Sequence, residues 1–104
     1  MFKGTYKNKE MFKKWLLLLP KINESSDKID SLICPYCGKK EIDYLYIGYK
    51  KDMIGYVQVW CNACKHGVYI SRIIIPENAK MIEMDDKTVD FNSLVPDYVQ
   101  VVPE

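Results

Sequence analysis

The first apolar pattern in the chain has a helical period. Asn8 is a suitable N-cap, and Glu10 would sit favourably in the first turn of a helix that follows it. Apolar side chains then recur at the spacing of one helix face, at Met11, Phe12, Trp15, Leu16 and Leu19. Because a proline interrupts a helix, we expect Pro20 to stop it. The pattern predicts an amphipathic helix within residues 1–22.

The middle of the chain changes to a strand pattern. Ile42–Tyr49 and Met53–Trp60 are rich in β-branched and aromatic residues, and a short polar run between them predicts a hairpin. A third strand, Val68–Ile75, ends at Pro76. Alternation places Ile42, Tyr44 and Tyr46 on one side of the first strand and Leu45, Ile47 and Tyr49 on the other. Both faces are apolar, so we expect the helix and the C-terminal segment to cover them.

The last part of the chain, residues 77–104, is acidic but regularly interrupted by apolar residues. It is too apolar for a free acidic tail, so we expect it to pack, with Tyr98–Val102 as a further strand. The polar run Asn23–Lys28 predicts a linker. The chain is thus predicted to be a single α+β domain over 1–104, with the helix in 1–22, the strands in 29–76 and the acidic segment in 77–104.

Charge is distributed unevenly along the chain. The formal net charge is only +1, yet residues 1–21 hold six lysines against Glu10, and residues 77–104 hold seven acids against two lysines. Four thiolates and one divalent cation would bring the net charge to about −1. A protein of this charge has no overall field that attracts nucleic acid, so any such binding would need a local basic patch.

The longest apolar run near the start, Trp15–Leu19, has five residues, and no small-residue cleavage site follows it. A membrane span needs about 18 apolar residues in succession. We therefore expect no membrane partner and a cytoplasmic, reducing location.

Four cysteines form the most informative motif in the chain. Cys34 and Cys37 make one Cys-x-x-Cys turn, and Cys61 and Cys64 make a second one, with 23 residues between the two turns. Each turn presents two sulfurs to one ion, and the intervening hairpin returns the chain to the same end. Four soft ligands in a tetrahedron predict one structural Zn²⁺ with no open position for a substrate.

The two turns resemble the knuckles of the zinc-ribbon family over about residues 33–75. The first, Cys34-Pro35-Tyr36-Cys37-Gly38, is the closer match, since Lys65 and His66 stand between Cys64 and the next glycine. The resemblance implies the fold and the metal. Zinc ribbons occur in transcription factors, polymerase subunits, ribosomal proteins and topoisomerases, and as protein-binding modules, so it only suggests partners.

Other uses of the cysteines stay open at this point. Disulfides fit poorly with a reducing compartment. Cys34-Pro35-Tyr36-Cys37 also matches the motif of glutaredoxin-like thiol oxidoreductases, but that motif should open a helix, and here a predicted strand follows. Four thiolates hold iron as well as zinc, so metal analysis must separate them. His66, the one histidine of the sequence, is expected near the site but outside the ligand set.

The sequence favours a non-enzymatic interaction module, with a protein or nucleic-acid partner, a regulatory role and no small-molecule substrate. Asp85 and Asp86 have no predicted base or nucleophile beside them and do not indicate a catalytic pair. The alternative is single-stranded nucleic-acid binding by aromatic residues of the sheet, which we expect to serve mainly as core, namely Tyr44, Tyr46, Tyr49, Tyr56, Trp60 and Tyr69. The oligomeric state is not predicted.

Overall fold

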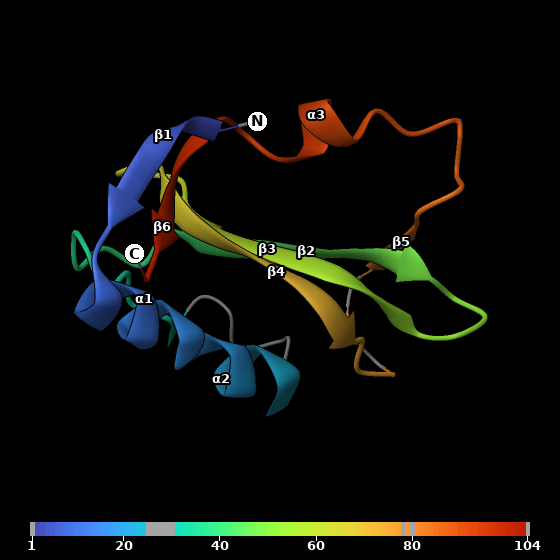
Figure 1. Ribbon diagram of the computed structural model, residues 1–104, viewed down its shortest axis with the longest axis horizontal. Helices are drawn as coiled ribbons and strands as arrows, with labels where there is room; N and C mark the ends of the chain where they lie inside the picture. The colour runs from blue at the N-terminus through green and yellow to red at the C-terminus, as the bar shows by residue number, and fades with distance from the viewer. Residues whose placement is uncertain (1, 25–30, 78, 80, 104) are drawn as a thin grey trace.

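A computed structural model describes residues 2–24, 31–77, 79 and 81–103. Residues 25–28 of the predicted linker lie outside the described residues, whereas residues 23 and 24 are helical, so the linker prediction is wrong there. The architecture is α+β, as predicted (Figure 1). The helices are α1 (Lys9–Leu16), α2 (Leu18–Glu24) and α3 (Phe91–Leu94), and the strands are β1 (Phe2–Lys7), β2 (Ile42–Tyr49), β3 (Ile54–Cys61), β4 (His66–Ile74), β5 (Met81–Glu83) and β6 (Tyr98–Val102).

The strands form one six-stranded sheet in the order β1-β6-β4-β3-β2-β5. Its centre is the predicted antiparallel meander, in which β3 pairs with both β2 and β4. Three parallel pairings extend the sheet beyond this meander: β6 lies beside β4, β1 beside β6, and β5 beside β2. The predicted strand Tyr98–Val102 is confirmed, whereas β1 and β5 were not predicted.

The N-terminal helical region differs from the prediction in one respect. Asn8 does cap α1, since its Oδ1 accepts the backbone N–H of Met11 at 2.9 Å. Pro20 does not end helical structure, because it lies in the first turn of α2, where a missing N–H costs little. It lacks the N–H that would bond to the Leu16 carbonyl, and α1 ends at Leu16. Among the described residues, no helix has the length and apolar content needed to cross a membrane.

Both faces of the sheet are covered, each by a different part of the chain. Helices α1 and α2 lie on one face, and the segment that carries α3 passes over the other (Figure 1). On the helix side, Trp15 and Leu18 belong to the same buried cluster as Tyr44 and Tyr46. On the other side, Val95 packs in a cluster whose further buried members are Leu45, Ile47, Trp60 and Tyr98. The alternation predicted for β2 is therefore confirmed.

Two tyrosines of these cores make alkaline stability a testable property. Burial raises the pKa of Tyr46 to about 12 and also raises the pKa of Tyr98, whose O–H donates to Gln58 Oε1 at 2.7 Å. Unfolded tyrosines titrate near pH 10, so the fold keeps protons that the unfolded chain has lost. Stability is therefore expected in full below about pH 10 and should fall as pH rises toward about 12.

Denaturant unfolding of wild type and Tyr46→Phe across this alkaline range tests the point. The phenylalanine variant cannot ionise at this position, so its stability should fall less steeply with pH. Equal pH slopes for the two proteins would contradict the assignment to Tyr46.

Candidate metal centre

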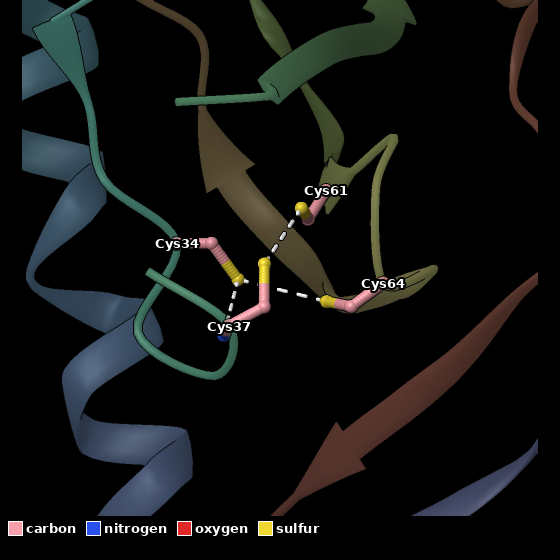
Figure 2. Close-up of side chains that lie close together, drawn as sticks. All are labelled: Cys34, Cys37, Cys61 and Cys64. Carbon is pink, nitrogen blue, oxygen red and sulfur yellow. Dashed lines mark hydrogen bonds between the residues drawn. The ribbon is translucent and has the colours of Figure 1, made fainter. Parts of the chain in front are cut away.

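The fold brings all four cysteines to one end of the meander. Cys34 and Cys37 lie in the turn before β2, Cys61 is the last residue of β3, and Cys64 lies in the turn before β4. Figure 2 shows the four sulfurs facing one another between the two turns. All four lie within 4.8 Å of one another, and two of the residues, Cys34 and Cys61, are buried. The predicted residues therefore form one compact group.

The spacing of the sulfurs fits a tetrahedral metal ion. Cys34 Sγ lies 3.7 Å from Cys64 Sγ, and Cys37 Sγ lies 3.6 Å from Cys61 Sγ. With Zn–S bonds of about 2.3 Å, a regular tetrahedron has sulfur–sulfur edges of about 3.8 Å. Each of these two pairs joins one turn to the other. An ion at the centre would therefore fasten the start of β2 to the end of β3.

The first turn directs backbone N–H groups at a sulfur of the cysteine group. The N–H groups of Tyr36 and Cys37 donate to Cys34 Sγ at 3.3 and 3.4 Å. Gly38 donates its N–H to the Cys34 carbonyl at 2.9 Å and has a φ of 77°. Donors aimed at a sulfur stabilise its thiolate, and the left-handed glycine lets the chain leave the turn.

The second turn reaches the same geometry without glycine. Lys65 stands at the position that corresponds to Gly38, and it donates its N–H to the Cys61 carbonyl at 3.0 Å. Its φ is 56°, a left-handed conformation that is costly for a residue with a Cβ. The Lys65 carbonyl accepts the N–H of Val99 at 2.7 Å, which ties the turn to β6. The second turn therefore lacks the glycine of the first and carries backbone strain at Lys65 in its place.

The two corresponding positions predict opposite effects of substitution. A Cβ on Gly38 would meet no atom within 4 Å, so Gly38→Ala tests backbone strain alone and should cost about 1 kcal/mol. Lys65→Gly should stabilise the protein by about 0.5 kcal/mol, because relieved strain exceeds the added entropy of the unfolded chain. Denaturant unfolding of the metal-loaded proteins measures both. A loss of stability in Lys65→Gly would show that its side chain matters more than its φ.

The thiols differ in how readily they ionise without a metal. Burial raises the pKa of Cys34 and, more strongly, that of Cys64. Burial also acts to raise the pKa of Cys37, but hydrogen bonds from the Lys39 backbone and the neighbouring thiols bring it below the ordinary value. Burial thus disfavours the thiolates of Cys34 and Cys64 in the unloaded group, and a bound cation would stabilise them.

His66 lies beside the second turn. Its Nδ1 is 3.0 Å from the Cys64 carbonyl oxygen. Because a carbonyl only accepts, Nδ1 carries the proton and is occupied by this hydrogen bond. The metal group itself consists of the four cysteines.

The predicted aromatic residues of the sheet are mostly core. Tyr44, Tyr46 and Trp60 are buried, Tyr56 and Tyr69 are half-buried against each other, and Tyr49 is exposed. Buried rings are not open to a nucleic-acid base. Sequence reasoning missed a different cluster, formed by Tyr6, Tyr36 and His66 beside the two turns. Its one signal was that Tyr36 precedes the predicted ligand Cys37 directly and that His66 follows Cys64 by two positions.

Comparisons of this chain with protein families, with curated proteins and with solved structures found no match.

Proposed function

We propose that this chain is a non-enzymatic interaction module built as a zinc ribbon over about residues 33–75. One structural Zn²⁺ would be held by Cys34, Cys37, Cys61 and Cys64. The convergence of four sulfurs from two turns, within 4.8 Å of one another, carries the proposal. Four thiolates complete the tetrahedral shell of zinc, so the ion would fix the fold and leave no position for a substrate.

The geometry gives less support to a thiol oxidoreductase. A disulfide exchanger needs only its two motif cysteines, yet here Cys34 also lies 3.7 Å from Cys64, and Cys37 lies 3.6 Å from Cys61, so all four sulfurs form one group. The first turn also leads through extended chain into β2, whereas glutaredoxin-like motifs open a helix. Both observations favour a shared ion over an exchanging pair.

The acidic pair Asp85 and Asp86 does not suggest a catalytic site either. Asp86 accepts the backbone N–H of Thr88 at 2.9 Å and also the Thr88 hydroxyl. The pKa of the Asp86 carboxyl is lowered, chiefly by these two hydrogen bonds. This is a carboxylate that stabilises its own turn, and we propose an exposed structural role for it.

Metal analysis of protein purified under reducing conditions tests the proposal. We expect one zinc ion per chain, no iron absorption band and four thiols that are unreactive until a chelator is added. A thiol–disulfide exchange assay should show no turnover above that of free thiol. Protein that contains no metal, or that holds iron in place of zinc, would refute the proposed zinc ribbon.

A further inference from the structure

Three aromatic rings from distant parts of the chain meet beside the metal centre. Tyr36, from the first turn, stacks on His66, from the start of β4, with ring centroids 3.9 Å apart and an interplanar angle of 20°. Tyr6, from β1, meets both rings edge-on, with centroid distances of 5.8 Å to Tyr36 and 6.1 Å to His66. We call these three residues the knuckle stack.

The arrangement leaves one ring face open. His66 covers one face of Tyr36, and Tyr6 stands beside the stacked pair, because its distances to the two rings are nearly equal. Tyr36 nevertheless remains 48% exposed. Neither of these two neighbouring rings covers the face of Tyr36 opposite His66. Such a face is held in one orientation by its neighbours and is available for a further planar group.

The knuckle stack is tied to the metal turns through its backbone and its imidazole. Tyr36 N–H donates to Cys34 Sγ, and His66 Nδ1 donates to the Cys64 carbonyl. The two stacked rings are therefore brought together by the same two turns that an ion would join. Loss of the ion should separate them.

Three lysines stand close to Tyr36 and His66 along the chain. Lys39 and Lys40 are exposed and follow the first turn directly, and Lys65 precedes His66. One acid, Glu41, directly follows Lys40. Lysine is depleted in the cores of protein–protein interfaces, whereas a lysine rim around an exposed ring suits a base next to its phosphates. The charge thus favours a nucleic-acid ligand over a protein.

We propose that the knuckle stack and Lys39, Lys40 and Lys65 bind single-stranded nucleic acid, with a base on the open face of Tyr36 and phosphates on the lysines. This inference rests on the proposed function and names the partner of the interaction module. It differs from binding on the sheet faces, whose aromatic rings are largely buried. A base in a duplex is already stacked on both sides, so duplexes should bind more weakly.

Fluorescence anisotropy with labelled oligo(dT) and oligo(U) of about 12 nucleotides tests the proposal and separates DNA from RNA. Tyr36→Ala should weaken binding about 5- to 150-fold, the effect of losing one stacked base. Tyr49→Ala is the matched control, since Tyr49 is 40% exposed and is followed by Lys50 and Lys51 at the other end of β2. It should leave the affinity within about twofold. Tyr36→Leu, which keeps apolar packing but not the ring, should behave like Tyr36→Ala.

The lysines predict the salt dependence. The plot of log Kobs against log salt has a negative slope. In Lys39→Gln/Lys40→Gln this slope should become shallower by about 1.4, because two contacts to the phosphates of a single strand are lost. The inference is overturned if zinc-loaded wild type fails to bind either strand at about 100 µM, if Tyr36→Ala and Tyr49→Ala bind alike, or if a duplex competes equally. A zinc-loaded protein that does not bind would leave the zinc ribbon standing, whereas a chain without zinc would refute both.

Discussion

Replacement of Cys61 with serine is expected to leave the chain largely unfolded. Cys61 ends β3, is fully buried, and lies 3.6 Å from the sulfur of Cys37. Serine is nearly isosteric but is a poor ligand for a soft-donor site, so only three thiolates would remain. Structural zinc contributes about 10–16 kcal/mol in small metal-dependent folds, which is as large as the net stability of a typical domain. Far-UV circular dichroism and zinc content of the purified variant measure the effect.

The same turn offers a matched control. Ala63 is exposed and lies between the two ligands of the turn, so Ala63→Ser adds a hydroxyl there without removing a donor. It should keep one zinc ion and the wild-type unfolding midpoint. Chelator treatment of wild type should reproduce the spectrum of Cys61→Ser. A Cys61→Ser protein that binds zinc fully and unfolds at the wild-type midpoint would show that the metal does not hold the fold.

The metal group was predictable because its signal is local. Each pair of ligands lies within one turn, and the strands between them are long enough and apolar enough to form a hairpin from sequence alone. The left-handed backbone of Lys65 was not predictable. That conformation is accompanied by tertiary contacts, chiefly the hydrogen bond from Val99 to the Lys65 carbonyl. Propensity gives no sign of such a contact.

The outer strands were missed because their pairing is non-local. β1 pairs in parallel with β6, so the first strand of the chain finds its hydrogen-bond partners in the last one. The sequence of β1 does alternate, since Phe2, Gly4 and Tyr6 are separated by polar residues. Two lysines in six residues nevertheless weaken the apolar signal. β5 has three residues, too few for any period to show. The knuckle stack was missed for the same reason, since Tyr6 reaches it only through the pairing of β1.

Replacement of Trp15 with alanine is expected to cost about 3–5 kcal/mol, the largest effect of any packing change considered for this chain. Trp15 is 0% exposed and belongs to the cluster beneath the sheet, and α1 lies against β4 and β6. Alanine would leave a cavity between helix and sheet that a rigid six-stranded sheet cannot close. Denaturant unfolding of the metal-loaded protein, followed by far-UV circular dichroism, measures the loss without depending on tryptophan fluorescence.

Two further substitutions separate packing from polarity at this position. Within the described residues, Trp15 Nε1 is buried without a hydrogen-bond partner, which itself costs stability. Trp15→Phe removes this N–H together with part of the ring, so it should lose less than about 2 kcal/mol. Leu17→Ala, two residues along at a side chain 67% exposed, should change stability by less than about 0.5 kcal/mol. Equal losses in Trp15→Ala and Leu17→Ala would mean that α1 does not pack on the sheet as described, and the cover of this face would then have to come from elsewhere in the chain.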